Sequence, residues 1–476
     1  MTLLVISPDY ASHLFPLATL ATAWAEQGER VVVATGPATD AIVRGFGFER
    51  VPLQLGRGSN PGVIKAEEQP PGEDRALRGF FEATRQGALE TLEFQARARA
   101  DDLLWAPVEV GRAVLDIVER IRPDTVIVDH LAFSARLALT SAGVPHGDVV
   151  LGHPTALPVG DEVYGCPPTF PTAFAPDPEQ LAGLRRLCED VRDAFTREWN
   201  AAARALSSLS SQSSSGGAAS VVEVSDAFGV TGDVLLLNYP EQLHDPARTA
   251  LLPPHRFLGS AVRTEPEDAQ VSHWLSSSEE PVVYVSLGSF LSVRDDVLGR
   301  VVEALRGLDV RVALAHGSTP ASAFGSLPST WLVREVLPQV TLLRSAALAV
   351  THGGNNSVTE ALTAGVPMVV LPLSTDQFAG AAALESAGVA TVLAPNSATP
   401  AEIQRAVAAL LGSVEANSRV RAVATTLLTS SGARRAREAL AGMRAATSLR
   451  PWQGGPEPAG RAPTARARAP RPEEDP

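Results

Sequence analysis

Short apolar runs alternate with helix-forming stretches along most of this chain, and this alternation limits the possible folds more than any other feature. In the N-terminal half, "TLLVIS" precedes a predicted helix over about residues 16–27, and "RVVVATG" then resumes a strand. The stretch "DTVIVDHLAFSARLALTSAGVPHGDVVLG" repeats the order of strand, helix and strand. This spacing predicts a parallel sheet with helices on both faces, which binds ligands beyond the carboxyl ends of its strands.

The C-terminal half shows the same alternation. Its predicted strands are "PVVYVSLGSF", "RVALAHG", "AALAVTHGG", "PMVVLPL" and "VATVLA". Because the 476 residues are about three times the length of a typical domain, we expect an α/β protein with two doubly wound, Rossmann-like domains. We place these domains at residues 1–262 and 263–446, with a linker near 263–270.

Three segments lack the strand signals. Residues 73–119 favour helices, and the low-complexity run "SSLSSQSSSGGAAS" over residues 207–220 predicts a flexible surface loop. The Pro- and Arg-rich tail over residues 447–476 has no core residues, so we expect it to be disordered.

Composition narrows the possible partners. The formal net charge of −13 argues against a nucleic acid or an anionic membrane surface. No apolar run is long enough to span a bilayer, and the N-terminus lacks the features of a signal peptide, so we expect a cytoplasmic protein. Cys166 and Cys188 are too few for a disulfide framework or a zinc site, and Lys65 is the one lysine. A small-molecule partner is therefore expected, and the oligomeric state stays open.

The stretch "THGGNNSVTEALTAGVPMVVLPLSTDQ" carries the strongest functional signal. Its paired glycines allow close approach of a ligand to the backbone, and the start of the following helix is an anion site. His352, Asn356 and Ser357 add side-chain donors there, so a phosphate is the expected ligand. Single residues of this set would also be explained as helix caps or turn residues.

Two further groups extend this site. Glu360 follows Asn356 by one helical turn and shares its helix face, which predicts a carboxylate for ribose hydroxyls beside the phosphates. Asp376 and Gln377 open the next helix at the same edge of the sheet, where they would bind a second polyol, although Asp376 would also serve as a helix cap.

The run "LPQVTLL…THGGNNSVTEALTAGVPMVVLPLSTDQ" resembles the donor-sugar signature of nucleotide-sugar-dependent glycosyltransferases of family 1, which decorate natural products. Plant glucosyltransferases and actinobacterial antibiotic enzymes belong to this family, and the likeness extends to "VYVSLGS" and "SHLFPLATLATAWAEQGERV". The resemblance implies the GT-B fold, in which two Rossmann-like domains face each other across a cleft. The N-terminal domain would bind the acceptor and the C-terminal domain the donor.

The resemblance also implies roles for single residues in the donor site. Residues implied to contact the diphosphate are Ser289, His352, Asn356 and Ser357, and Gly354 is implied to be a further donor-binding residue. Glu360 is implied to bind the ribose, Asp376 and Gln377 the sugar hydroxyls, and Gln339 to lie near the base. This chain has Val336 and Asn355 where plant members have Trp, so base stacking and the sugar contacts are expected to differ.

His13 and Asp129 are the candidate catalytic pair. His13 follows the first strand, as the catalytic base of the family does, and Asp129 resembles the Asp that orients this base. A neutral imidazole removes a hydroxyl proton near neutral pH, and a carboxylate stabilises the resulting imidazolium. His13 would otherwise be a histidine at a helix start, and Asp129 a helix cap. We expect His130 to point away from Asp129.

These residues predict the transfer of a sugar to a small, apolar or aromatic natural product, with inversion of the configuration at the anomeric carbon. The chain has no Asp-x-Asp pair of the kind that holds a metal on a sugar diphosphate, so we expect no metal and no cofactor beyond a UDP- or dTDP-sugar as co-substrate. The acceptor pocket would include residues 153–171. The alternatives are a nucleotide-sugar epimerase or hydrolase, or a degenerate GT-B protein that activates another transferase. The acceptor, the sugar and the choice between UDP and dTDP stay open.

Overall fold

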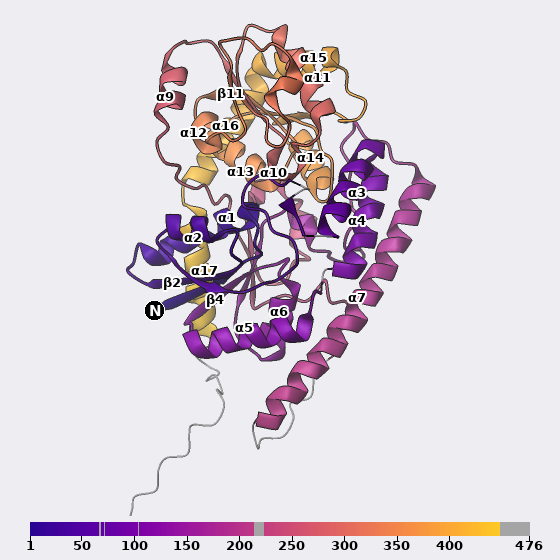
Figure 1. Ribbon diagram of the computed structural model, residues 1–476, viewed down its shortest axis with the longest axis vertical. Coiled ribbons are helices and arrows are strands. Elements are labelled where there is room, and N and C mark those ends of the chain that lie inside the picture. The colour runs from indigo at the N-terminus through magenta and orange to yellow at the C-terminus, as the bar shows by residue number, and fades with distance from the viewer. Residues whose placement is uncertain (66–67, 71, 103, 214–222, 448–476) are drawn as a thin grey trace, which may run out of the picture.

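A computed structural model describes residues 1–65, 68–70, 72–102, 104–213 and 223–447. They form two α/β domains stacked along the long axis of the molecule (Figure 1). This arrangement confirms the expected fold of two facing Rossmann-like domains. In the part of the chain that the structure describes, no helix has both the length and the apolar character needed to cross a membrane.

The N-terminal domain contains a parallel sheet of seven strands in the order β3-β2-β1-β4-β5-β6-β7. Both faces are buried, because Leu4 and Ile6 of the central strand β1 enter one core while Leu3 and Val5 enter another. The strands are β1 Thr2–Ile6, β2 Arg30–Thr35, β3 Glu49–Pro52, β4 Thr125–Asp129, β5 Gly147–Val150, β6 Val234–Leu237 and β7 His255–Phe257.

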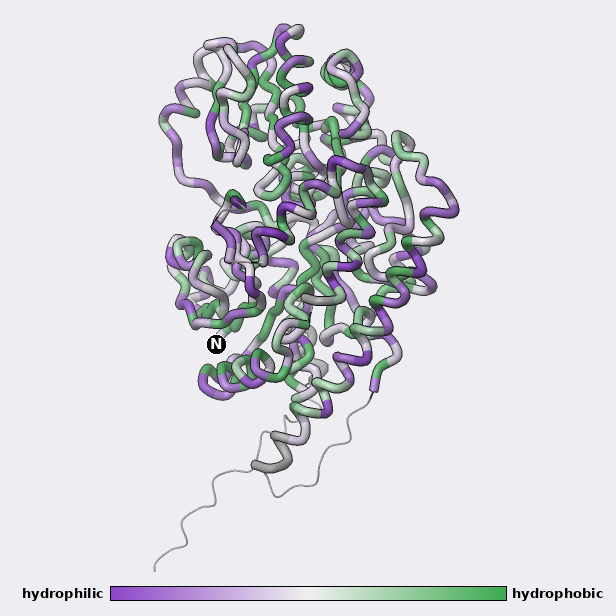
Figure 2. The backbone as a smooth tube through the Cα atoms, turned by 45° about the vertical axis from the view of Figure 1, so that its right-hand side comes forward, coloured by the Kyte–Doolittle hydropathy of each residue, from purple (hydrophilic) through white to green (hydrophobic). Residues whose placement is uncertain are grey.

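Helices cover this sheet and form an additional layer beside it. They are α1 Ala11–Ala25, α2 Asp40–Gly45, α3 Glu73–Gln86, α4 Ala88–Asp102, α5 Pro107–Ile121, α6 Phe133–Ser141, α7 Pro178–Ser213 and α8 Pro246–Thr249, with 3-10 turns at Pro154–Ala156 and Glu241–Leu243. The outer helices alternate hydrophobic and hydrophilic residues along their length (Figure 2).

Two expected boundaries in this domain were wrong. α1 begins at Ala11 instead of near residue 16, and Pro16 lies inside it, so the proline does not mark the helix start. α7 continues to Ser213 through the first part of the run expected to be a loop. Serine costs little more than other ordinary residues in a helix, and extending a formed helix adds one hydrogen bond per residue. The remainder of that run, residues 214–220, lies outside the described residues, as does the tail from residue 448.

The C-terminal domain contains a parallel sheet of six strands in the order β10-β9-β8-β11-β12-β13. Each of the five predicted strands is present. The strands are β8 Val282–Ser286, β9 Arg311–Ala315, β10 Leu332–Arg334, β11 Ala346–Thr351, β12 Met368–Val370 and β13 Ala390–Val392. The helices are α9 Ala269–Ser276, α10 Gly288–Leu291, α11 Asp295–Arg306, α12 Gln339–Leu343, α13 Asn355–Ala364, α14 Gln377–Ser386, α15 Pro400–Leu411 and α16 Val414–Leu428, with a 3-10 turn at Ala321–Phe324.

The last helix, α17 (Gly432–Thr447), returns to the N-terminal domain, where it is drawn in yellow in Figure 1. It packs against α1, β6 and β7, and Ala436 and Leu440 enter the same core as Leu3. The sequence had grouped these residues with the C-terminal domain. The chain passes between the domains twice, near Ser260 and near Gly432. These two segments lie side by side, because a Cβ on Gly432 would lie 2.7 Å from the carbonyl oxygen of Ser260.

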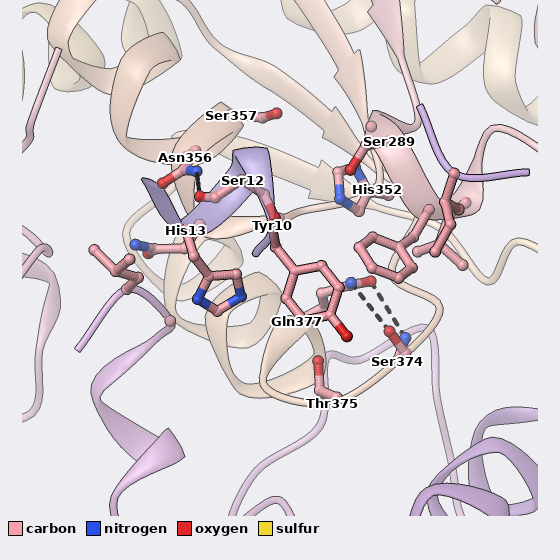
Figure 3. A pocket seen from close by; sticks show the side chains of 18 of the residues that line it. Tyr10, Ser12, His13, Ser289, His352, Asn356, Ser357, Ser374, Thr375 and Gln377 are labelled. Atoms are coloured by element: carbon pink, nitrogen blue, oxygen red, sulfur yellow. Dashed lines mark hydrogen bonds between the residues drawn. The ribbon is translucent and has the colours of Figure 1, made fainter. Parts of the chain in front are cut away.

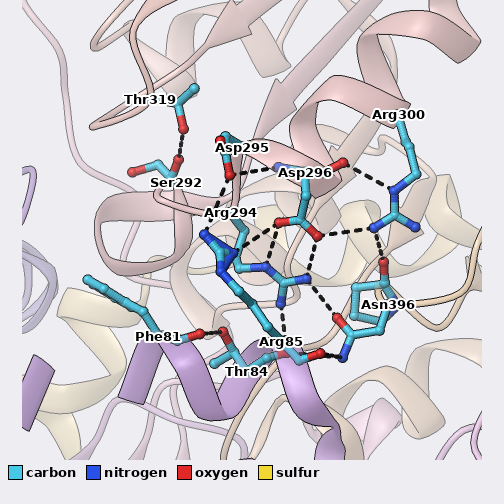
Figure 4. Close-up of polar contacts among 11 residues, drawn as sticks. Phe81, Thr84, Arg85, Ser292, Arg294, Asp295, Asp296, Arg300, Thr319 and Asn396 are labelled. Carbon is cyan, nitrogen blue, oxygen red and sulfur yellow. Dashed lines mark hydrogen bonds and ion pairs between the residues drawn. The ribbon is translucent and has the colours of Figure 1, made fainter. Parts of the chain in front are cut away.

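The end of α3 is bound to the C-terminal domain through a network of polar side chains (Figure 4). The carbonyl of Thr84 accepts hydrogen bonds from Arg294 Nη1 at 2.7 Å and from Asn396 Nδ2 at 3.0 Å. Arg294 is buried and also holds Asp296 through two bonds of 2.7 Å. Because α3 belongs to the N-terminal domain, this network fixes the two domains relative to each other on one side of the cleft.

Candidate active site between the domains

A cavity of about 790 Å³ lies between the two domains. Its walls come from both domains, including the start of α1 and the start of α13 (Figure 3). The sequence-predicted residues that line it are His13, Ser289, Val336, Gln339, His352, Gly354, Asn355, Asn356, Ser357, Asp376 and Gln377. Asp129 and Glu360 lie behind this wall, each in contact with a residue that lines it.

His13 lies in the first turn of α1, where its ring edge reaches the cavity. Its Nδ1 is 2.7 Å from Asp129 Oδ2, and the Asp129 side chain is fully buried at the end of β4. Burial alone would lower the pKa of His13, but the charge and hydrogen bond of Asp129 raise it above its ordinary value. Burial would likewise raise the pKa of Asp129, and pairing with His13 lowers it. The pair therefore holds an ionised carboxylate behind an imidazole whose Nε2 is available to the cavity.

His130 also lines the cavity, beside the His13–Asp129 pair. It is buried, and neither ring nitrogen has a hydrogen-bond partner among the described residues. Burial, together with the nearby positive charge of Arg136, lowers the pKa of His130 to about 4, so the ring is neutral near pH 7. The sequence indicated only that His130 points away from Asp129 and gave no signal for a place in the cavity wall.

Two glycines make room for the His352 ring: Gly288, the first residue of α10, and Gly354, the residue before α13. A Cβ on Gly288 would lie 2.5 Å from His352 Cε1, and a Cβ on Gly354 would lie 2.3 Å from His352 Nε2. Real Cβ atoms do not approach other atoms this closely, so a side chain at either position would have to displace the His352 ring. Burial lowers the pKa of His352 to about 4, which leaves the ring neutral. The first turn of α13 and the hydroxyl of Ser357 border the same part of the cavity.

The two asparagines at the start of α13 connect the domains. Asn355 Nδ2 donates to the carbonyl of Asn238 at 2.9 Å, and Asn356 Nδ2 donates to the carbonyl of Ser12 at 2.7 Å. Ser12 and Asn238 both belong to the N-terminal domain, so these side chains position the start of α13 against that domain. Sequence reasoning gave them a ligand-binding role only.

Glu360 is almost entirely enclosed, with 4% of its surface exposed. Arg263 Nη1 binds its Oε1 at 2.6 Å, and Gln339 Nε2 binds its Oε2 at 2.6 Å. Burial raises the pKa of Glu360, and the charge of Arg263 opposes that rise. Arg263 itself lines the cavity, a position the sequence did not predict, because the residue stands in a linker where charge alone carries no structural signal.

Asp376 and Gln377 lie at the start of α14, and both are held by protein groups. Asp376 Oδ2 accepts from the backbone N–H of His153 at 2.5 Å, which is a further contact between the domains. Gln377 Oε1 accepts from the backbone N–H of Leu373 and Ser374, and its Nε2 donates to Ser374 Oγ at 3.1 Å (Figure 3). The two side chains are thereby fixed at the cavity wall.

Val336 and Ser289 also line the cavity. Val336 has 63% of its surface exposed and supplies no aromatic face. Beside α10, Asn60 Nδ2 lies 3.4 Å from Ser289 Oγ, and the N–H of Ile64 donates to the Ser289 carbonyl at 3.1 Å. A segment of the N-terminal domain therefore reaches across to Ser289. Within the described ranges, no cluster of three or more His, Cys, Asp or Glu side chains is placed to hold a metal ion.

In a comparison with known protein families, the region that matches a family model lies mainly in the C-terminal half of the chain. Residues 230–419 match the family model described as "UDP-glucoronosyl and UDP-glucosyl transferase". The NDP-glycosyltransferase YjiC of Bacillus licheniformis is 29% identical over 181 residues, which cover 38% of this chain and 46% of that protein. The oleandomycin glycosyltransferase of Streptomyces antibioticus is 30% identical over 220 residues, covering 45% of this chain and 50% of that protein. The chain thus spans about half the length of these curated relatives.

Solved structures agree with the whole architecture. The calicheamicin glycosyltransferase CalG4 has a TM-score of 0.62 and 20% identity, covering 94% of this chain and 98% of its own. The glycosyltransferase VinC, solved in complex with DTDP, has a TM-score of 0.63 and 18% identity, covering 94% of this chain and 100% of its own. These likenesses establish the fold. Residues 230–419 are thus similar to the UDP-glucoronosyl and UDP-glucosyl transferase family, and the two domains have the GT-B fold.

Proposed function

We propose that this protein is an inverting, metal-independent glycosyltransferase that moves a sugar from a UDP- or dTDP-sugar to a hydroxyl of a small, largely apolar natural product. One observation carries the proposal. His13, which is paired with Asp129, and the start of α13 border the same cavity, although they come from different domains. A general base and an anion site are thus placed together, as a transfer from a sugar diphosphate requires. The relatives named for NDP-sugar and oleandomycin transfer support this class of reaction.

The acceptor half of the reaction is assigned to His13. With Nδ1 bound to Asp129, Nε2 accepts the proton of the acceptor hydroxyl while its oxygen forms a bond to the anomeric carbon. The bond from that carbon to the diphosphate oxygen breaks on the opposite face, so the anomeric configuration inverts. Asp129 fixes the tautomer and stabilises the imidazolium that forms.

The leaving diphosphate is assigned to the start of α13. Backbone N–H groups and the helix dipole favour negative charge there. Ser289, Ser357 and neutral His352 add donors to the same wall. Asp376 and Gln377 are assigned to the sugar hydroxyls, and their fixed positions favour one orientation of the sugar.

The other half of the cavity supports an apolar acceptor. Its wall contains large apolar side chains, including Phe80 and Phe94, and the ring of Tyr164 from the segment predicted to build this pocket. Two polar atoms in this region, Gln95 Oε1 and Arg99 Nη1, have no hydrogen-bond partner among the described residues. Such groups favour an acceptor that carries a few polar substituents on an apolar frame.

The test is to incubate the protein with UDP- and dTDP-sugars and a panel of aromatic and macrocyclic alcohols, in buffer containing EDTA. The proposal expects a glycoside whose anomeric configuration, measured by NMR, is opposite to that of the donor, and about a hundredfold or more slower formation of this product by the His13→Gln variant. Release of free sugar with every acceptor would favour the hydrolase, and a new nucleotide sugar would favour the epimerase. Nucleotide binding without turnover would favour the degenerate partner protein.

A further inference from the structure

Arg263 occupies the place where the sequence predicted a ribose-binding carboxylate. Going along α13 from its start, the phosphate-binding turn is followed by Glu360, one turn further on. The cavity wall here is formed by the Arg263 side chain, with Glu360 behind it. Both oxygens of Glu360 are bound, one to Arg263 and one to Gln339. A ligand in the cavity therefore meets a guanidinium at this point.

Three contacts hold Arg263 in this position. Its Nη1 binds Glu360 at 2.6 Å, and its Nη2 binds Glu265 at 2.8 Å. Glu265 is itself fixed by Thr341, whose backbone N–H and hydroxyl donate to it at 2.9 and 3.0 Å. The guanidinium also lies 5.2 Å from the centre of the Phe15 ring, where a cation is attracted to the ring face. Arg263 is thus anchored to the linker, the donor helix and α1 together.

A ribose hydroxyl is a weak competitor for this carboxylate. The bond between Arg263 and Glu360 joins two opposite charges at a largely enclosed carboxylate, whereas a ribose hydroxyl brings only a neutral donor. A neutral diol would have to displace a charged partner that is held at its other side by Glu265. We therefore expect the Arg263–Glu360 pair to stay closed when a nucleotide binds.

On these grounds, and resting on the proposed function, we propose that Arg263 masks Glu360 and makes the donor site indifferent to the ribose 2′-hydroxyl. The site then binds ribonucleoside and 2′-deoxyribonucleoside diphosphates alike. A guanidinium has five N–H donors, and two of them are used by Glu360 and Glu265, which leaves three. An N–H group of Arg263 can donate a hydrogen bond to the 3′-oxygen, which both classes of nucleotide carry. An exposed carboxylate would instead accept hydrogen bonds from both the 2′- and the 3′-hydroxyl of a ribose.

The experiment compares UDP with dUDP, which differ only in the 2′-hydroxyl, by isothermal titration calorimetry. For the wild type we expect the two Kd values to agree within about threefold, because no charged group is satisfied by the 2′-hydroxyl alone. Arg263→Ala uncovers Glu360, and the preference for UDP should rise to about tenfold or more, the usual effect of one hydrogen bond to a charged group. Adding Glu360→Gln to that variant should return the ratio to the wild-type value.

The matched control is Arg334→Ala. Arg334 is a partly exposed arginine in the same domain, paired with Asp268 at 2.6 Å, and it should not alter the ratio. Arg263→Asn serves as a second variant if Arg263→Ala lacks a cooperative melting transition. A wild type that already prefers UDP by tenfold overturns the proposal, as does an unchanged ratio in the folded Arg263 variants. Failure of the wild type to bind either nucleotide would instead overturn the proposed function, and this inference with it.

Discussion

Asn356 Nδ2 donates a 2.7 Å hydrogen bond to the carbonyl of Ser12, the residue next to His13 in α1. Pro16 follows Ser12 by one helical turn and has no N–H, so it cannot donate the helical hydrogen bond to the Ser12 carbonyl that another residue would donate. The proline inside α1 thus leaves the Ser12 carbonyl free to accept the hydrogen bond from Asn356, which links α13 to the turn that carries His13. The proline therefore has a structural use beyond interrupting the hydrogen bonds of α1.

Replacing this proline tests the link. Pro16→Ala restores an N–H that competes with Asn356 for the Ser12 carbonyl. We expect the melting temperature to rise, since an interior proline costs a helix about 3 kcal/mol, while kcat falls because His13 is less firmly positioned. Steady-state kinetics and calorimetry on the same preparation measure both. A variant that is more stable and equally active would show that the link does not serve catalysis.

Loss of the base should slow transfer strongly, with little effect on donor binding. In His13→Gln we expect kcat to fall by about 10²- to 10⁴-fold, the usual contribution of a positioned general base, with the Kd for UDP unchanged. His255→Gln is the control, because His255 lies on the edge strand β7 outside the cavity wall. Equal activity of the two variants would remove His13 from the mechanism.

The pH dependence follows from the raised pKa of His13. Transfer needs the neutral ring, so kcat/KM should rise with pH through an apparent pKa above about 6.5, and Asp129→Asn should move this pKa downward. The pairing also stabilises the fold: its contribution is complete below about pH 6.5 and is lost as the pH rises through the folded-state pKa. A rate profile in Asp129→Asn that keeps the wild-type midpoint would contradict this account.

The exposed Val336 offers a gain-of-function test. Val336→Trp places an aromatic face at the end of the cavity where the sequence predicts the nucleotide base. Stacking of a base on an aromatic ring is worth about 1–3 kcal/mol, so the Kd for UDP should fall by roughly fivefold to a hundredfold. Val414→Trp, at a position with 85% of its surface exposed, should leave nucleotide binding unchanged. Titration calorimetry distinguishes the two, and no tightening by Val336→Trp would place the base elsewhere.

The network at the end of α3 should control how firmly the domains are joined. Arg294→Met removes the donor to the Thr84 carbonyl and the partner of Asp296. We expect a loss of about 2 kcal/mol or more in the free energy of unfolding, since hydrogen bonds to charged groups contribute roughly 1.5–3 kcal/mol. Small-angle X-ray scattering should show a larger radius of gyration. Unchanged scattering would mean that the remaining contacts suffice to hold the domains.

The sequence predicted the elements whose signals are local and missed those that depend on distant partners. The alternation of apolar runs and helices was enough for both sheets, and the position of His13 after β1 was enough to place it at the cavity. The enclosure of Glu360 was not predictable, because it depends on Arg263 folding back from the linker. The cross-domain bonds of Asn355 and Asn356 depend in the same way on residues that only the folded chain brings near.

The return of α17 has a consequence for synthesis of the protein. The core that contains Leu3 also contains Leu440, so the N-terminal domain is assembled from both ends of the chain. During translation this domain cannot complete its core until the C-terminal domain has left the ribosome. An exchange of C-terminal domains between proteins of this fold would likewise have to keep residues 432–447 with the N-terminal domain.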